Sequence, residues 1–255
     1  ALPQKFKRKK ILLQKILSRA KNIIANSNFT KQEILKLGID EQKIVIVNPG
    51  PNITPSNLDL AELAEIKNKY QLNGKKVILS VGRLVRRKGF DLTIEAVAQI
   101  VKTRQDFTYL IVGNGPDFMR LEKIIVNKKA GQFVRVINQV DDQLLAAYYQ
   151  ACDFLVMPAR QIDYDFEGFG IVYLEANGFG KPVIGAKSGG VAEAIIDGQT
   201  GFLIEPDNLD QLVEKINQFL NQPDLAKKLG LQGLQRVIDD FDWQKIVAKI
   251  KLILN

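Results

Sequence analysis

The chain of 255 residues contains no histidine and a single cysteine, Cys152. Without histidine, this chain cannot form a Ser-His-Asp triad or a Cys-His pair, and it lacks the commonest zinc ligand. One cysteine cannot form an internal disulfide and supplies no second thiol for a zinc site, which favours a reducing compartment, by default the cytoplasm. Any chemistry must therefore use carboxylates, lysine, arginine and backbone amides.

Long apolar runs are also missing. None approaches the roughly 18 consecutive apolar residues of a membrane-spanning helix, and we expect no signal peptide, because the basic start lacks the apolar stretch and cleavage site that would follow. Hydrophobic residues make up 46% of the chain and charged residues 25%, which is typical of a globular protein. With roughly 150 residues per domain as a guide, the length predicts one large domain, or one domain with part of another.

The net charge of +8 is concentrated at one end of the chain. Residues 1–21 contain eight lysines and arginines and no acidic residue, so the remainder balances at 28 basic and 28 acidic side chains. A nucleic-acid-binding protein would be expected to carry a basic face across its fold, with aromatic residues for stacking on single strands. We therefore expect no nucleic acid among the partners.

From residue 76 onward, short apolar runs alternate with amphipathic stretches. Most of the runs are nearly continuous, as in parallel strands that helices bury on both faces. This pattern predicts an α/β fold, a Rossmann-like doubly wound parallel sheet of six strands, followed by C-terminal helices. The expected strands are residues 77–81, 108–112, 133–137, 153–157, 182–186 and 201–205, and the expected helices are 92–102, 116–129, 141–151, 171–179, 191–196, 209–220, 223–241 and 242–254.

The first fifty residues do not continue this pattern, and a segment rich in proline and asparagine follows them at 48–55. Such segments often mark linkers and domain boundaries. We infer that residues 1–48 are the tail of a preceding domain with its linker, and that residues 49–255 form the next domain. An N-terminal hairpin on the edge of the sheet is the alternative. The elements expected in the first part are a helix ending near Arg19, a strand at 22–25, a helix at 30–37 and a strand at 43–47.

The loop after the first expected strand of the sheet carries four cations within six positions. Ligands of open α/β sheets bind beyond the carboxyl ends of the strands, where this loop lies. Glycine lets backbone amides approach an anion, while arginine and lysine neutralise phosphate oxygens. The loop therefore predicts a phosphate site, with a solvated basic loop as the alternative. The cations are Arg83, Arg86, Arg87 and Lys88, between Gly82 and Gly89.

The loop after the second strand contains Gly113, Asn114 and Gly115 and begins like a dinucleotide-binding fingerprint. Phe118 occupies the position of the third glycine, and the loop belongs to the second crossover rather than the first. An NAD-dependent dehydrogenase is therefore not favoured. A tight turn that lines a base or sugar pocket is the plainer interpretation.

Two glutamates frame the loop that opens the helix expected at 171–179. Glu167 precedes Gly168-Phe169-Gly170, and Glu175 follows inside the helix. Free amides at a helix N-terminus suit an anion or a polar hydroxyl. A carboxylate can accept two hydrogen bonds from vicinal hydroxyls, so the pair indicates a sugar nucleotide. Either glutamate alone could instead be an ordinary solvated helix residue.

Two further signals are less specific. Ser188, Gly189 and Gly190 precede a short helix, where the glycines allow close backbone approach or simply form a turn. Asp163 and Asp165 form an Asp-x-Asp pattern of the kind that holds a divalent cation on a diphosphate. Because the cationic loop already supplies positive charge, we expect no metal ion.

Four segments, taken together and in this order, resemble a known family. They make residues 44–255 similar to the C-terminal, donor-binding half of the retaining GT-B glycosyltransferases of family four, also called group one. The resemblance implies a two-domain enzyme whose acceptor-binding domain is mostly absent from this sequence, and residues 1–48 resemble the end of that domain. The segments are VGRLVRRKG, GNGP, EGFGIVYLEANGFGKPVIG and SGGVAEAIIDGQTGFLIEP.

The resemblance also implies roles for single residues. Arg83 and Lys88 would contact the donor diphosphate and stabilise the leaving group, and Glu167 would contact hydroxyls of the transferred sugar, which makes these three the expected catalytic residues. Glu175 would hold the ribose hydroxyls. The other expected donor-binding positions surround the nucleotide and the sugar, and they are Gly82, Gly113, Gly115, Gln139, Val140, Gly168, Phe169 and Gly170.

The reaction implied by the resemblance is transfer of a hexosyl group from a UDP- or GDP-sugar to a glycan or lipid-linked acceptor, with retention of configuration, in cell-envelope polysaccharide synthesis. No cofactor and no metal ion are implied, because fixed cations and a helix N-terminus take the place of the metal. Two alternatives stay open. One is a non-catalytic sugar-nucleotide-binding module that completes a partner chain. The other is a hexosyl phosphorylase of related architecture, although no segment matches its lysine-linked pyridoxal phosphate site.

Residues 1–21 alternate cations with aliphatic side chains, and this pattern has two interpretations. The segment could lie on an anionic membrane surface near a lipid-linked acceptor, or it could be an ordinary helix of the missing domain. We favour the second. The expected location is the cytoplasm, with peripheral contact at the inner face of the membrane under the first interpretation.

Overall fold

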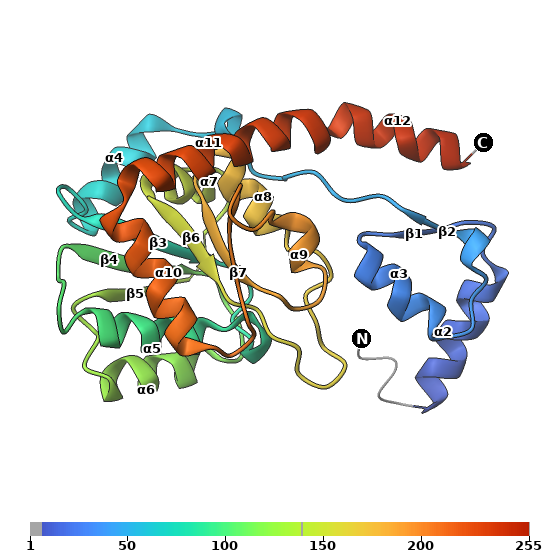
Figure 1. Cartoon of the computed structure of the whole chain (residues 1–255), viewed down its shortest axis with the longest axis horizontal. Helices are drawn as coiled ribbons and strands as arrows, with labels where there is room; N and C mark the ends of the chain where they lie inside the picture. The colour runs from blue at the N-terminus through green and yellow to red at the C-terminus, as the bar shows by residue number, and fades with distance from the viewer. Residues whose placement is uncertain (1–6, 139, 255) are drawn as a thin grey trace.

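The computed structural model describes residues 7–138 and 140–254. Its centre is a six-stranded parallel sheet in the order β5-β4-β3-β6-β7-β8 (Figure 1). The first strand, β3, lies beside the fourth, β6, so the chain winds outward in opposite directions from this pair. The predicted doubly wound fold is confirmed. The strands are β3 (Lys76–Val81), β4 (Phe107–Val112), β5 (Val134–Ile137), β6 (Phe154–Met157), β7 (Val183–Ala186) and β8 (Gly201–Ile204).

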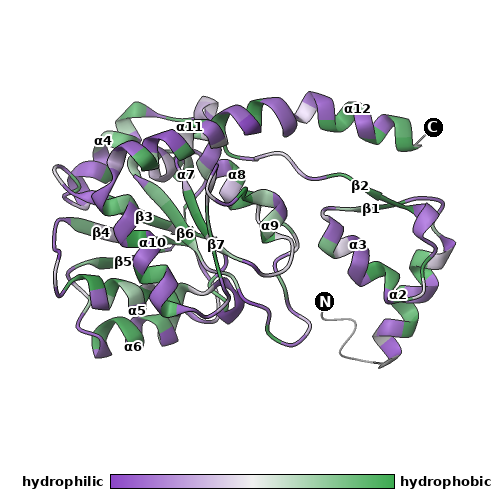
Figure 2. Ribbon diagram, viewed as in Figure 1, coloured by the Kyte–Doolittle hydropathy of each residue, from purple (hydrophilic) through white to green (hydrophobic). Residues whose placement is uncertain are grey.

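Helices cover both faces of the sheet, and a separate hydrophobic core fills each side. β3 shows the alternation that builds the two cores, since Leu79 points to one and Ile78 to the other, and both are fully buried. The central strands are accordingly hydrophobic in Figure 2. The covering helices are α4 (Leu60–Lys69), α7 (Asp142–Ala151) and α8 (Ile171–Gly178) on one face, and α5 (Phe90–Ile100), α6 (Phe118–Asn127) and α10 (Leu209–Asn221) on the other.

One helix, α4, was not predicted, and the ends of several others lie one or two residues from the predicted positions. α4 packs against α7, and only Ile66 among its residues is buried. A helix with one buried residue gives a weak periodic pattern of apolar residues in the sequence. Asp59 caps the N-terminus of α4 by accepting a hydrogen bond from the amide of Ala61. α9 (Val191–Ala194) is one turn long and ends before the predicted residue 196.

Of the last two helices, the first packs on the fold and the second extends away from it (Figure 1). α11 (Pro223–Asp240) packs on α8, and α12 (Trp243–Leu254) starts after a break at Phe241 and Asp242. α12 extends toward the first part of the chain (Figure 1), where the Asn22 side chain donates a hydrogen bond of 2.7 Å to the carbonyl of Ile253.

The first part of the chain forms a unit of its own, called here the N-terminal unit, residues 7–48. Its two strands pair in parallel and are not hydrogen-bonded to the six-stranded sheet in the described residues. The alternative of a hairpin on the sheet edge is therefore wrong. A small core that includes Ile23, Leu37 and Ile44 holds the unit together. Its elements are α2 (Lys7–Arg19), β1 (Ile23–Ala25), α3 (Asn28–Leu35) and β2 (Ile44–Ile46).

Within the described ranges, no helix is both long and apolar enough to cross a membrane.

Candidate functional site

The loops that follow the strands meet at the carboxyl edge of the sheet. The pair β3 and β6 lies at the centre of the sheet, where the order of the strands reverses. In doubly wound folds this is the position at which ligands bind. The loops singled out in the sequence follow β3, β4, β6 and β7, so the topology gathers them around this point.

A buried ion-pair cluster lies in the loops after β3 and β6. Glu167 is only 8% exposed. Its Oε2 atom accepts hydrogen bonds from Nζ of Lys88 at 2.5 Å and from Nη1 of Arg87 at 2.7 Å. The structure therefore brings together two of the three residues expected to be catalytic, Lys88 and Glu167.

The cluster keeps Glu167 ionised. Burial alone would raise the pKa of this carboxyl group, but the charges and hydrogen bonds of Lys88 and Arg87 outweigh burial and hold the pKa below its ordinary range. An ionised, fixed carboxylate accepts hydrogen bonds and does not act as a general acid at neutral pH.

The sequence analysis named Arg87 only as one of four cations in its loop and gave it no role of its own. Its Nε atom also pairs with Oδ1 of Asp165 at 3.1 Å, so its guanidinium joins two carboxylates of one loop. In the sequence, nothing distinguishes Arg87 from the neighbouring arginines. It stands next to Lys88 in a single 3-10 turn, Arg86–Lys88, which turns both side chains toward the same loop.

The same ion pair bears on the Asp-x-Asp pattern. Asp165 pairs with Arg87, and residues 162 and 165 close a tight turn by backbone hydrogen bonds. Among the described residues, no group of three or more acidic, cysteine or histidine side chains is placed to hold a metal ion.

Arg83, the third residue expected to be catalytic, lies outside the buried cluster. Its side chain is exposed, and within the described part of the chain no carboxylate forms an ion pair with it. The loop after β3 thus presents one buried lysine that is engaged with Glu167 and two exposed arginines, Arg83 and Arg86, that no described carboxylate pairs with.

The glycines after β4 bring two loops into backbone contact. Gly113 has φ +152°, and a Cβ atom there would lie 1.9 Å from the carbonyl oxygen of Gly82. A Cβ atom at Gly115 would lie 2.4 Å from the carbonyl oxygen of Leu84. The amide of Leu84 in turn donates to the carbonyl of Asn114 at 2.9 Å. These glycines are required by packing, whatever they contact in a ligand.

A similar contact supports the backbone of Glu167. The amide of Gly190 donates to the carbonyl of Glu167 at 2.9 Å. Cβ atoms at Gly189 and Gly190 would each lie 2.1 Å from a carbonyl oxygen, that of Glu167 and that of Gly168 respectively. The turn after β7 therefore packs on the loop of residues 165–170. That loop ends at Gly170, which precedes α8 with φ +94°.

Glu175 lies in a different environment from Glu167. It is 4% exposed, and the hydroxyl of Tyr149 donates to its Oε2 at 2.7 Å. Burial raises the pKa of the Glu175 carboxyl group, and the negative charge of Asp142 adds to this rise. Hydrogen bonds from Tyr149 and from the backbone of residues 52 and 53 oppose it. Tyr149 is a neighbour that the sequence analysis missed.

The expected base-binding positions follow β5. Gln139 lies outside the described residues. Val140 is partly buried and packs against the core on the α7 side of the sheet.

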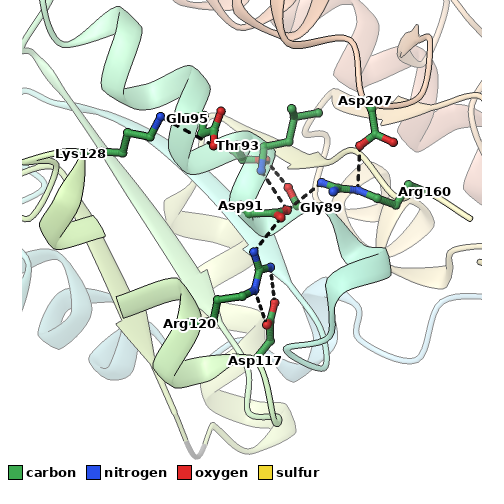
Figure 3. Close-up of polar contacts among 10 residues, drawn as sticks. Gly89, Asp91, Thr93, Glu95, Asp117, Arg120, Lys128, Arg160 and Asp207 are labelled. Atoms are coloured by element: carbon green, nitrogen blue, oxygen red, sulfur yellow. Dashed lines mark hydrogen bonds and ion pairs between the residues drawn. The ribbon is translucent and has the colours of Figure 1, made fainter. Parts of the chain in front are cut away.

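A polar network around Asp91 follows the cationic loop in the sequence and is shown in Figure 3. Asp91, at the start of α5, accepts from Arg120 at 3.0 Å and from Arg160 at 2.7 Å. The amide of Arg160 donates to the carbonyl of Arg87 at 2.7 Å. Arg160 also pairs with Asp207 after β8. Loops from four strands are thereby tied together, which fixes the backbone at Arg87 and Lys88.

The doubly wound sheet has the architecture expected of one half of a GT-B glycosyltransferase, with charged loops at its switch point. A family model for glycosyl transferases group 1 matches residues 63–236, more than half of the chain. The chain therefore belongs to the glycosyl transferases group 1, as its motifs predicted.

Two curated relatives illustrate the family. A GDP-mannose-dependent alpha-(1-6)-phosphatidylinositol monomannoside mannosyltransferase of Mycolicibacterium smegmatis is 30% identical over 194 residues, 75% of this chain and 51% of that protein. A GDP-mannose-dependent monoacylated alpha-(1-6)-phosphatidylinositol monomannoside mannosyltransferase of Corynebacterium glutamicum is 34% identical over 181 residues, 70% of this chain and 47% of that protein. The chain spans about half the length of these relatives.

Solved structures show the same fold along nearly the whole chain. A glycosyltransferase from Rickettsia africae superposes with a TM-score of 0.83 at 29% identity, covering 98% of this chain and 68% of that one. The Anabaena protein HepE in complex with UDP-glucose gives a TM-score of 0.87 at 22% identity, covering 99% of this chain and 69% of that one. The second likeness is one of fold alone. Together they confirm the expected GT-B architecture.

Proposed function

We propose that this chain carries the donor site of a retaining glycosyltransferase, which moves a hexosyl group from a nucleoside diphosphate sugar to a glycan or lipid-linked acceptor. The observation that carries the proposal is the buried Glu167, paired with Lys88 and Arg87 at the switch point of the sheet. In many proteins a buried ion pair does not increase stability, so stability alone does not explain why this one is present. A carboxylate held beside fixed cations can instead bind a sugar that is attached to phosphates, because the carboxylate accepts hydrogen bonds from hydroxyls and the cations bind phosphate oxygens.

In this proposal the two cations of the first loop bind the diphosphate. Arg83 is exposed and has no ion-pair partner among the described residues, so it is available to an incoming phosphate, and Lys88 lies at the inner side of the same loop. As the bond between sugar and phosphate breaks, negative charge grows on the departing diphosphate. Fixed cations stabilise that charge more in the transition state than in the ground state, and no metal ion or other cofactor is needed.

Glu167 binds sugar hydroxyls in this proposal and is not the nucleophile. Its Oε2 atom is already shared by Arg87 and Lys88, which lowers its reactivity toward carbon. Retention then follows from attack on the same face, with the departing phosphate accepting the proton of the acceptor hydroxyl. The backbone amides of Phe169 and Gly170, in the loop before α8, lie beside the sugar in this proposal.

The remaining roles concern the nucleoside. Glu175, oriented by the hydroxyl of Tyr149, holds the ribose hydroxyls. The other donor-binding positions line the nucleotide and the sugar, and they are Gly82, Gly113, Gly115, Gln139, Val140, Gly168, Phe169 and Gly170.

The relatives suggest which donor to test first. Two of them, at 30% and 34% identity, are described as GDP-mannose-dependent, so a GDP-sugar is preferred here over a UDP-sugar, and GDP-mannose is the first candidate. Both are also described as acting on phosphatidylinositol monomannosides. These names support a lipid-linked acceptor. The proposed setting is cell-envelope polysaccharide synthesis in the cytoplasm.

The N-terminal unit fits a remnant of the acceptor domain, with residues 1–48 as its tail and linker. In α2, Leu13 and Leu17 pack on the small core, whereas Ile11, Leu12 and Ile16 are 56%, 58% and 57% exposed. We propose that the rest of the acceptor domain covers this exposed strip. Contact of the strip with an anionic membrane is the alternative.

Calorimetric titration of the purified chain with GDP, UDP and ADP, with and without Mg²⁺, tests the proposal. We expect one nucleotide to bind without metal and the double variant Arg83→Ala/Lys88→Ala to lose that binding. Arg86→Ala removes another exposed cation of the same loop and should bind as the parent does. Equal binding by the parent and the double variant would overturn the assignment of the diphosphate site.

A further inference from the structure

The N-terminal unit touches the donor half through the start of α3. The amide of Asn28 donates to Oε2 of Glu193 at 2.7 Å, and the amide of Phe29 donates to Oε1 of the same carboxylate at 3.0 Å. Amides in the first turn of a helix have no partner within the helix. Glu193, which lies more than 160 residues away in the sequence, therefore caps a helix of the other unit and adds favourable charge at its positive end.

Glu193 is itself held firmly. It lies in α9, which faces α3 in Figure 1. Arg236 donates to the carbonyl oxygens of Glu193 at 2.7 Å and of Ala194 at 2.8 Å. The turn just before α9 is the one whose Gly190 amide bonds the carbonyl of Glu167. A short, rigid path thus joins the carboxylate of Glu193 to the backbone of Glu167.

Neighbouring residues of the N-terminal unit rest on the same loop. The side-chain amide nitrogen of Asn26 lies 2.9 Å from where a Cβ atom of Gly168 would stand. The ring of Phe29 meets the ring of Phe166 edge-on, with 4.9 Å between their centroids. The strand-to-helix junction of residues 26–29 therefore packs on the loop of residues 165–170, directly beside Glu167.

We propose that Glu193 is a positioning residue: it docks the 26–29 junction on the 165–170 loop and so couples the placement of the N-terminal unit to that of Glu167. The inference rests on the proposed function, because docking can affect donor binding only if Glu167 contacts the sugar of the donor. Glu193 does not itself contact the donor. It acts through the amides of Asn28 and Phe29 on one side and through the glycine turn on the other.

Coupling of this kind is reciprocal. If docking holds the 165–170 loop in the form that binds the sugar of the donor, then binding of that sugar must strengthen docking. The nucleoside diphosphate alone, which lies at Arg83 and Lys88 in the proposed site, should have a much smaller effect. The amides of Asn28 and Phe29 report docking directly, because their exchange with solvent requires the bonds to Glu193 to open.

Hydrogen exchange on the full chain tests the docking without any ligand. We expect Glu193→Ala to speed exchange at Asn28 and Phe29 about tenfold or more, and Glu193→Gln, which keeps an acceptor oxygen, to have a smaller effect. Glu41→Ala is the matched control. It removes a carboxylate that pairs with Lys31 of α3 from within the N-terminal unit, and it should leave both amides as they are. Unchanged exchange in Glu193→Ala would overturn the proposal.

The second arm adds a nucleotide sugar or the corresponding nucleoside diphosphate, with affinities measured by calorimetry. We expect the nucleotide sugar to slow exchange at Asn28 and Phe29, and Glu193→Ala to weaken binding of the nucleotide sugar about tenfold while leaving the diphosphate unchanged. Equal affinity of the parent and Glu193→Ala for the nucleotide sugar would overturn the coupling. Failure of every nucleotide to bind the parent would instead count against the proposed function, and the ligand-free arm would still decide the docking.

Discussion

The Nζ atom of Lys88 lies 2.5 Å from Oε2 of Glu167, and both side chains are almost completely buried. Arg87 is the second cation on this carboxylate. Removing one partner of a buried pair leaves a charge without compensation, which is far more costly than losing an ion pair at the surface. The pair therefore links the stability of the fold to the residues proposed to bind the donor.

Replacing Lys88 by methionine should lower the free energy of unfolding by about 1–3 kcal/mol, at the low end for a broken buried pair because Arg87 still neutralises Glu167. Urea unfolding measures the change. Lys187→Met provides the control, since it removes an exposed lysine that pairs with Glu205 and should alter stability little. A Lys88→Met variant as stable as the parent would show that the pair is not closed in solution.

The two glutamates should give stability opposite dependences on pH. For Glu167, burial opposes ionisation, but Lys88 and Arg87 prevail and lower the pKa below its ordinary 4.5. The stability it contributes is present above pH 4.5 and is lost as the pH falls through the lowered pKa. For Glu175, burial raises the pKa above 4.5. In the folded protein the Glu175 carboxyl group stays protonated to a higher pH than in the unfolded chain, so the free energy of unfolding declines as the pH rises from 4.5 through the raised pKa.

Urea unfolding of the parent, Glu167→Gln and Glu175→Gln across about pH 3.5 to 7 separates the two effects. The advantage of the parent over Glu167→Gln should grow as the pH rises. Relative to Glu175→Gln, the parent should lose stability over the same range. Parallel trends for the two variants would contradict the assigned environments.

Gly113→Ala should destabilise the fold by about 2–4 kcal/mol, because a Cβ atom would collide with the carbonyl of Gly82 in a backbone conformation that side chains rarely adopt. Gly74→Ala is the matched control. Gly74 has φ +76° but open space around it, so only the conformational strain of about 1 kcal/mol should appear. Equal losses for the two variants, measured by urea unfolding, would mean that the loops after β3 and β4 are not in contact.

The exposed strip of α2 should not bind membranes by itself. Flotation with anionic liposomes compares the parent with a triple variant, Ile11→Ser/Leu12→Ser/Ile16→Ser, which keeps the buried face of the helix intact. We expect neither protein to float, because the strip is proposed to meet the rest of the acceptor domain. Flotation of the parent that the triple variant loses would favour the membrane interpretation.

Much of the fold could be predicted because its strands are buried on both faces. The six runs of β-branched and other apolar residues stand out for that reason, and parallel order follows from the helices between them. α4 was missed because it contributes one buried residue, Ile66, to the core. Its signal lies in the cap at Asp59 rather than in periodicity.

The candidate site was predicted less completely, because the spacing of residues within a motif does not show which distant side chains they contact. The motifs located Lys88 and Glu167. The choice of Arg87 rather than Arg83 as the second partner of Glu167 depends on how a single 3-10 turn aims its side chains. Tyr149 and Glu193 reach their partners from distant segments. An isolated tyrosine gives no sign of such a contact, and the motif that contains Glu193 does not show which amides it binds.

The most direct test is whether Glu167 contributes to the affinity for the sugar part of the donor. Calorimetry should compare a nucleoside diphosphate with its nucleotide sugar, GDP and GDP-mannose first, on the parent and on Glu167→Gln. We predict that the parent binds the nucleotide sugar about tenfold more tightly than the diphosphate, and that Glu167→Gln binds the diphosphate normally but loses this preference. A preference that survives in Glu167→Gln would contradict the central claim.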